Sequence, residues 1–167
     1  MSYLCPFSRK YPSPSLKDDL FFMSMAYNEA ISAWEEGEVP VGAIVVQHQH
    51  IIAAAHNRIE ALGDATAHAE ILAMRQASHS LGDWRIPEST LYVTKEPCPM
   101  CTGAMLLSRI GTIVFAFSDD KMGCLGGALS LHQWPQSHHH PRVHSGVMAK
   151  ECYQLLRAFF ESRRGKS

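Results

Sequence analysis

Two short motifs contain the residue types that bind metal ions and move protons. The first is His68-Ala69-Glu70, and the second is Pro97-Cys98-Pro99-Met100-Cys101. Cysteines three positions apart in the first turn of a helix lie on one side of it, and the free N–H groups there favour the thiolate form. Two thiolates and one neutral imidazole provide three ligands of a tetrahedral zinc site and leave the fourth position for water, as in catalytic zinc sites. The spacing therefore predicts one Zn²⁺ per chain, bound by His68, Cys98 and Cys101.

Glu70 lies two residues after His68, in the opening turn of a predicted helix. From the end of that helix its carboxylate can accept a proton from a metal-bound water and pass protons to a substrate. We therefore predict that Glu70 is the catalytic residue. Each motif alone is weak, because a single histidine is usually structural and Cys-x-x-Cys also occurs in redox pairs and zinc knuckles. Together, at the starts of two helices, the motifs are the signature of zinc deaminases.

The hydrophobic pattern predicts the elements that position these motifs. Helical spacing covers residues 16–36, 66–80, 98–108 and 149–163, with Asp64 or Thr66 as the cap of the second helix. Strand-sized apolar runs cover residues 41–47, 51–56, 91–95, 112–117 and 143–148, and a long loop spans 122–140. The first two strands are joined by a tight turn and form a hairpin. This order predicts an α/β fold, a three-layer α/β/α sandwich around one mixed five-stranded sheet.

Composition fits one globular domain with a short extension. Apolar residues make up 46% and charged residues 19% of the 167 residues. We expect a proline-containing irregular arm over residues 1–15 and one domain over 16–167. No run is long enough to span a membrane, and no signal peptide is apparent. The cysteines are odd in number and two form Cys-x-x-Cys, which favours metal-binding thiols in a reducing cytoplasm over a disulfide framework.

The net charge of −1 excludes a global attraction to nucleic acid, but the end of the chain is locally basic. Residues 150–167 contain Lys150, Arg157, Arg163, Arg164 and Lys166 against Glu151 and Glu161. Such a segment can bind phosphates or can simply keep a surface solvated. Charge alone favours the second interpretation.

Beyond these motifs, the chain resembles the bacterial-type tRNA-specific adenosine deaminases of the cytidine deaminase-like superfamily. The resemblance covers nearly everything from about residue 20 to residue 164. The matching segments are Glu38-Val39-Pro40-Val41-Gly42-Ala43, His56-Asn57-Arg58, Thr66-Ala67-His68-Ala69-Glu70, Thr90-Leu91-Tyr92-Val93-Thr94, Glu96-Pro97-Cys98, Ser108-Arg109-Ile110-Gly111, Asp119 with Lys121 and Gly123, and Phe159-Phe160 with Arg163-Arg164. The Val-Pro-Val-Gly and His-Asn-Arg segments indicate the tRNA-editing branch of the superfamily.

This resemblance implies a cytidine deaminase-like fold and a hydrolytic, zinc-dependent conversion of the wobble adenosine of a tRNA anticodon to inosine. Water attacks C6 of a flipped-out adenine, while Glu70 protonates N1 and assists the departure of ammonia. Asn57 and the backbone N–H of Ala69 would contact the base. The remaining residues that the resemblance assigns to the RNA are Asp119, Lys121, Phe160, Arg163 and Arg164. It also implies a homodimer, with substrate contacts contributed across the interface.

Two other functions stay open from the sequence. One is a zinc deaminase of a free base or nucleoside, such as guanine, cytosine or cytidine, which shares the chemistry and differs in the pocket. The other is a non-catalytic RNA-binding protein with a structural zinc, although a structural site does not need Glu70. Asn57 and Asp119 also have structural interpretations, because both residue types commonly end strands and form turns.

The chain departs from the family pattern at several positions. Ala65 stands where proline is usual, and Lys95 replaces a residue that is more often apolar or neutral. The loop after Asp119 is slightly longer and contains His138-His139-His140, which we interpret as polar loop residues because adjacent side chains on an extended chain alternate in direction. We interpret Cys124 and Cys152 as small buried or partly exposed residues.

Overall fold

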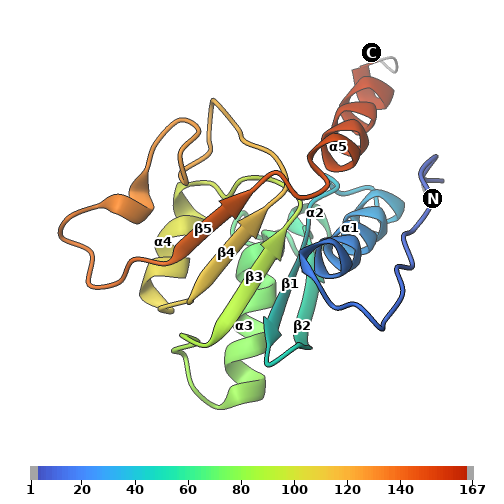
Figure 1. Cartoon of the computed structure of the whole chain (residues 1–167). Helices are drawn as coiled ribbons and strands as arrows, with labels where there is room; N and C mark the ends of the chain where they lie inside the picture. The colour runs from blue at the N-terminus through green and yellow to red at the C-terminus, as the bar shows by residue number, and fades with distance from the viewer. Residues whose placement is uncertain (1–3, 165–167) are drawn as a thin grey trace.

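The computed structural model describes residues 4–164, which form a mixed five-stranded sheet covered by helices (Figure 1). The strand order is β2-β1-β3-β4-β5. Strand β1 (Gly42–Gln47) pairs antiparallel with β2 (His50–His56) and with β3 (Ser89–Val93). The parallel strands β4 (Thr112–Phe115) and β5 (Arg142–Ser145) extend the sheet beyond β3. This mixed five-stranded sheet with its helices confirms the predicted fold class.

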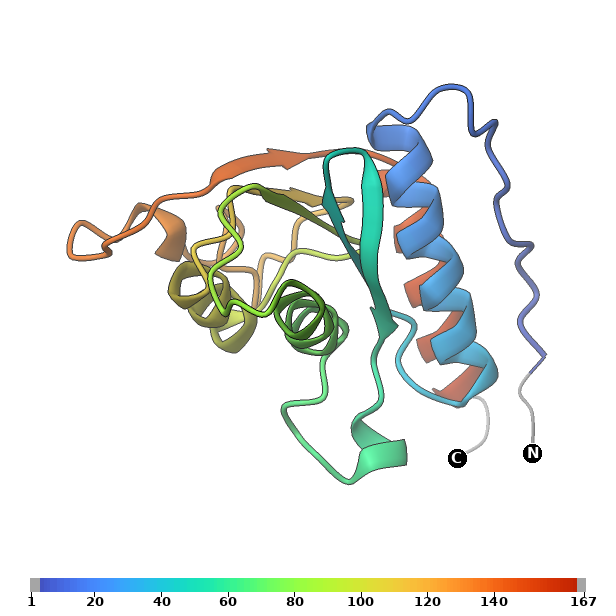
Figure 2. The ribbon, with the colours of Figure 1, turned by 90° about the horizontal axis from the view of Figure 1, so that it is seen from below.

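Helices lie on both faces of the sheet (Figure 2). Helices α1 (Asp19–Glu35) and α5 (Ala149–Arg164) lie side by side on one face, and α3 (Ala69–Leu81) and α4 (Pro99–Leu107) cover the other. Successive residues of β1 point to opposite faces. Ala43 and Val45 therefore join the core under α3 and α4, whereas Ile44 and Val46 join the core under α1 and α5.

The helix predicted from residue 66 begins instead at Ala69, and its N-cap is His68 rather than Asp64 or Thr66. The Asp64 carboxylate accepts hydrogen bonds from the backbone N–H and hydroxyl of Thr66, at 2.8 and 2.7 Å. Asp64 thus forms a short turn with Thr66 that is completed before the helix begins. Its side chain is occupied in this turn and does not cap α3. The displaced start leaves His68 in an extended conformation, with φ −71° and ψ 150°.

Other element boundaries agree with the prediction to within three residues. Helix α1 begins at Asp19 because the Asp18 carboxylate accepts a hydrogen bond from the N–H of Phe21 and caps it. Two elements were not predicted, the short helix α2 (Ile59–Leu62) and a 3-10 turn at Leu131–Gln133 inside the long loop. Both are too short to produce a periodic hydrophobic signal.

Residues 4–17 form no helix or strand and run along the outside of α1 (Figure 2). Arg9 donates to the carbonyl of Asn28 and pairs with Glu35, both at 2.7 Å. The backbone of Lys10 exchanges two further hydrogen bonds of 2.7 Å with the Asn28 side chain. The first three residues of the predicted arm, and Lys166 of the basic segment, lie outside the described residues. Within residues 4–164, no helix is both long and apolar enough to cross a membrane.

Candidate active site

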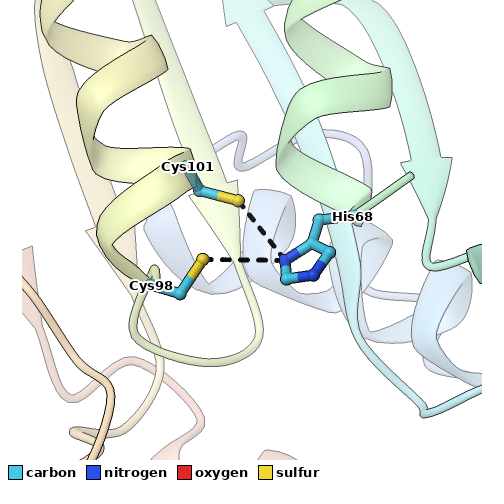
Figure 3. A group of neighbouring side chains, drawn as sticks. All are labelled: His68, Cys98 and Cys101. Carbon is cyan, nitrogen blue, oxygen red and sulfur yellow. Dashed lines mark hydrogen bonds between the residues drawn. The ribbon is translucent and has the colours of Figure 1, made fainter. Parts of the chain in front are cut away.

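Three candidate metal ligands meet at the starts of α3 and α4 (Figure 3). His68 caps α3, Cys98 caps α4, and Cys101 lies in the first turn of α4. The Nδ1 atom of His68 is 3.7 Å from Sγ of Cys98 and 3.5 Å from Sγ of Cys101. The three ligand atoms lie within 4.8 Å of one another, and Figure 3 shows the two sulfurs and the ring nitrogen facing each other.

This donor set fits a zinc ion. Tetrahedral bonds of about 2.3 Å to sulfur and about 2.0 Å to nitrogen place a sulfur and a nitrogen about 3.5 Å apart, close to both observed distances. Pro99 occupies the first turn of α4, where a missing N–H has no cost. Among residues 4–164, no fourth histidine, cysteine or carboxylate joins the group. A group of three protein ligands is the pattern of a catalytic site rather than a closed structural one.

The electrostatics of the group favour a thiolate at Cys98. A hydrogen bond from Cys101 is the largest influence, and with the adjacent His68 ring it lowers the pKa of Cys98 to about 3 against the opposing effect of burial. The hydrogen bond to Cys98, together with burial, raises the pKa of the Cys101 thiol. The contact with Cys98 also raises the pKa of His68. A thiolate beside an imidazole is suited to binding a cation.

Glu70 is the second residue of α3 and is buried, with 4% of its surface exposed. Burial raises the pKa of its carboxyl group, although its own backbone N–H and the nearby His68 act in the opposite direction. A carboxyl group whose pKa is raised toward neutrality can both hold and release a proton during a reaction. The structure therefore places a buried carboxyl group with a raised pKa directly beside the candidate metal ligands.

A pocket of about 260 Å³ lies next to these groups. This volume is close to the lower end of the range for small-molecule sites, about 300 to 1,000 Å³. Polar groups of the pocket come from three motifs that are distant in the sequence, and apolar side chains complete its walls. The lining residues are Val39, Val41, Asn57, Ile59, His68, Glu70, Lys95, Glu96, Cys98, Leu156 and Phe160.

The structure brings only some of the predicted substrate-binding residues into this pocket. Asn57 and Phe160 line it. Ala69 is the first residue of α3, so its N–H belongs to the turn that lacks intrahelical partners. Asp119 does not line the pocket but forms an ion pair with Lys95, which does. The exposed Lys121 donates its backbone N–H to Asp119 at 2.9 Å.

Lys95, which departs from the family pattern, is paired in the structure with Asp119. Although partial burial acts the other way, the Lys95 ammonium and nearby backbone N–H groups hold the pKa of Asp119 below its usual value. Because Lys95 also lines the pocket, it adds a positive charge to the pocket wall.

Arg163 and Arg164 lie at the end of α5, outside the pocket lining. Arg163 donates to the carbonyl of Gly37 at 2.7 Å, and its guanidinium lies 4.9 Å from the centre of the Phe159 ring. Arg163 therefore helps to hold α5 against the end of α1, whereas Arg164 is exposed.

Two buried carboxylates had no role assigned from the sequence. Glu38 accepts hydrogen bonds from the Asn57 side chain at 3.1 Å and from the N–H of Ala61 at 2.8 Å. Glu96 accepts three backbone hydrogen bonds, from Asp119, Leu125 and Gly127, at 2.8, 2.8 and 2.9 Å. The only sequence signal was their position, since each is a charged residue beside a Val-Pro or Pro-Cys motif.

The histidines of the long loop, and Cys124 and Cys152, do not line the pocket. His139 Nε2 contacts the carbonyl of Ile110 at 2.5 Å, and His140 Nδ1 contacts the carbonyl of His132 at 2.9 Å, so the two rings have separate partners. Cys124 and Cys152 are buried, as predicted, and all five cysteines are free thiols.

Comparison with known proteins agrees with this geometry. The MafB19-like deaminase family model matches residues 17–164, which defines the chain as a deaminase. The tRNA-specific adenosine deaminase of Bacillus subtilis (strain 168) is 46% identical over 151 residues, which cover 90% of this chain and 94% of that protein. A structure solved in a study of A-to-I editing by tRNA:A34 deaminases superposes with a TM-score of 0.78 at 41% identity, covering 80% of this chain and 97% of that one. The chain belongs to the tRNA-specific adenosine deaminase family.

The fold is shared more widely. The guanine deaminase from Nitrosomonas europaea superposes with a TM-score of 0.72 at 23% identity, over 86% of this chain and 85% of that one. This likeness shows the common architecture and leaves the substrate to be argued from the pocket.

Proposed function

We propose that this protein deaminates the wobble adenosine of a tRNA anticodon to inosine, using Zn²⁺ held by His68, Cys98 and Cys101. The observation that carries the proposal is the meeting of His68, Glu70, Cys98 and Asn57 in one pocket of about 260 Å³. The relative from B. subtilis is named a tRNA-specific adenosine deaminase. The structure at 41% identity comes from a study of A-to-I editing at the wobble position of tRNA.

Bound at these residues, zinc would supply a Lewis acid that makes water a nucleophile at neutral pH. The protein's own side chains would position the base and move the protons. Asn57 and the N–H of Ala69 hydrogen-bond the adenine, and the apolar walls exclude bulk water. Glu70 accepts a proton from the attacking water and passes it to N1. It then takes the second proton from the C6 hydroxyl and delivers it to the departing amino group. One water is consumed and one ammonia is released, which leaves the C6 carbonyl of inosine.

The rim of the pocket is suited to single-stranded RNA. Phe160 is 43% exposed at the pocket edge, where it can stack on a neighbouring base. We assign Asp119 to the sugar of the target nucleotide, and Lys121 and Arg164 to nearby phosphates. Arg163, which is hydrogen-bonded to the carbonyl of Gly37, would contact the RNA from the end of α5, next to Arg164.

An assay of inosine formation tests the proposal. The zinc-loaded protein is given a wobble-adenosine anticodon stem-loop and, separately, free guanine, cytosine and cytidine. We expect inosine in the RNA and no turnover of the free compounds. Turnover of a free base or nucleoside without inosine formation would support the alternative deaminase, and inactivity toward all substrates would support a non-catalytic RNA-binding protein.

The role of Glu70 is tested by Glu70→Ala. We expect this variant to keep its fold and about one zinc per chain, measured by elemental analysis, and to lose activity by about 10²- to 10⁴-fold. Glu60→Ala, at an exposed position of α2, serves as the control and should behave as the wild type. Loss of the metal from Glu70→Ala would show that Glu70 is a ligand rather than the proton carrier.

We also propose a homodimer that works in the cytoplasm, where tRNA is present and thiols stay reduced. A groove of about 980 Å³ lies on the outer face of α3 and α4. Its lining includes the large, exposed apolar side chains of Trp84, Leu107 and Trp134. Exposed apolar patches of this kind mark interaction sites. A second copy seated there would lie against α4, the helix that carries both cysteines.

Size-exclusion chromatography with light scattering tests this dimer. Leu107→Glu should convert the protein to a monomer, because it places a charge in the apolar groove. Leu20→Glu changes an exposed leucine of α1, on the opposite side of the sheet, and should remain dimeric. A wild-type monomer, or a Leu107→Glu dimer of unchanged mass, would contradict the proposal.

A further inference from the structure

Glu38 is a buried carboxylate that lies just behind the pocket. It belongs to the connection between α1 and β1, and only 2% of its surface is exposed. Burying a charged carboxylate costs free energy unless its oxygens are hydrogen-bonded. Glu38 meets this condition, because Oε1 accepts from the N–H of Ala61 and Oε2 accepts from Nδ2 of Asn57. Asn57 in turn is buried and lines the pocket, whereas Glu38 does not.

This pair of contacts fixes the orientation of the Asn57 amide. A carboxylate can only accept hydrogen bonds, and the backbone N–H of Ala61 can only donate. Glu38 therefore requires a donor at its second oxygen, and of the two ends of the Asn57 amide only the nitrogen can supply one. The carbonyl oxygen and the second N–H of Asn57 are left for other partners. The amide cannot turn over without placing its oxygen against a carboxylate oxygen.

We propose that Glu38 is a positioning residue that holds Asn57 in one of its two amide orientations and so sets the hydrogen-bonding pattern offered to the substrate base. The inference rests on the proposed function, because the orientation of Asn57 matters only when a base occupies the pocket. Glu38 acts through Asn57 and does not touch the substrate.

Replacing Glu38 with glutamine inverts this arrangement while conserving its volume. The glutamine oxygen stays on the N–H of Ala61, since that backbone group cannot change. The glutamine nitrogen then faces Asn57, which must turn over its amide and present its oxygen instead. Both buried hydrogen bonds survive, so Glu38→Gln should fold and bind zinc normally. In the pocket, however, donor and acceptor have exchanged places.

The activity test is a double-mutant cycle on the zinc-loaded protein with the anticodon stem-loop. Glu38→Gln should lower kcat/KM by about 10- to 100-fold, as expected for one mismatched buried hydrogen bond, with the increase in KM larger than the decrease in kcat because Glu70 is unchanged. In the Asn57→Ala background, Glu38→Gln should lower kcat/KM by less than about 3-fold. Glu60→Gln, an exposed carboxylate on neighbouring α2, is the matched control and should have no effect.

A stability test reports on the contact without any substrate. Asn57→Asp places two carboxylates side by side and should lower the melting temperature. Adding Glu38→Gln to that variant should restore part of the loss, because the glutamine nitrogen can donate to the introduced carboxylate. Equal effects of Glu38→Gln with and without Asn57, unchanged kcat/KM in the single variant, or no restoration in the double variant would overturn the proposal. If the wild type deaminates a free base instead of RNA, the proposed function fails, and the same cycle with that base still decides the role of Glu38.

Discussion

The carboxylate of Glu96 should be among the most important single groups for stability, because it holds the loop that follows β4. Its Oε1 accepts from the N–H groups of Leu125 and Gly127, and its Oε2 accepts from the N–H of Asp119. The residue is 1% exposed. Glu96→Gln keeps the shape of the side chain and leaves one oxygen for the first two donors, but it turns an NH₂ group toward the N–H of Asp119.

The expected cost follows from this change of one oxygen. One charge-assisted hydrogen bond, about 1.5 to 3 kcal/mol, is lost, and the N–H of Asp119 is left facing another donor. We therefore expect Glu96→Gln to lower the free energy of unfolding by about 2 to 3 kcal/mol. For a domain of this size, each kcal/mol corresponds to about 2 to 4 °C, so the melting temperature should fall by about 4 to 12 °C.

Urea unfolding and calorimetry of the zinc-loaded protein measure both quantities. Glu88→Gln is the matched control, since the side chain of Glu88 is 69% exposed and forms a surface ion pair with His48. It should change stability by less than about 0.5 kcal/mol. If Glu96→Gln also stays within about 0.5 kcal/mol of the wild type, the three backbone hydrogen bonds do not hold the loop as argued.

Two further predictions concern neighbouring features. Although burial acts the other way, hydrogen bonds with Glu29 and Glu36 raise the pKa of His56 above its ordinary value of about 6.5. The contribution of protonated His56 to stability should therefore be fully present below about pH 6.5 and disappear as the pH rises through the pKa of the folded state. Urea unfolding should show the deficit of His56→Asn shrinking from pH 5.5 to pH 8.5, and a deficit that grows with pH would contradict this. Gly127→Ala would place a Cβ against the Glu96 carboxylate and the Asp119 carbonyl, so it should cost about 1 to 3 kcal/mol, visible as a lower melting temperature; an unchanged melting temperature would refute the close approach.

The meeting of His68, Cys98 and Cys101 was predictable because each of the two motifs that carry them is a local signal. Cys98 and Cys101 lie in one helical turn, and Pro97 and Pro99 mark where that turn starts. The sheet was predictable for a similar reason, since its buried strands are continuous apolar runs. The start of α3 was not predictable from capping preferences. Thr66 is a favourable N-cap type, yet the chain uses His68, which has no side-chain capping bond. The local preference for Thr66 is overridden here, and the ring of His68 lies beside Cys98 and Cys101.

The roles of Glu38 and Glu96 could not be predicted because their partners are distant in the sequence. Asn57 follows Glu38 by 19 positions, and the partners of Glu96 follow it by 23 to 31 positions. Neither periodicity nor a motif encodes such pairings, and only the folded chain shows which donors reach each oxygen. The same is true of Lys95, whose unusual charge becomes understandable only once Asp119 is found beside it.

The three buried carboxylates around the pocket, Glu38, Glu70 and Glu96, differ in the groups that surround their oxygens. Glu38 and Glu96 accept hydrogen bonds from backbone or amide N–H groups on both oxygens, which hold the two side chains in fixed positions. Glu70 lies instead beside the thiols and imidazole of the metal-binding group, and burial raises the pKa of its carboxyl group. Of the three, Glu70 is the one that lies beside the candidate metal ligands, as its proposed role of proton carrier requires, while Glu38 contacts the amide of Asn57 and Glu96 contacts the loop after β4.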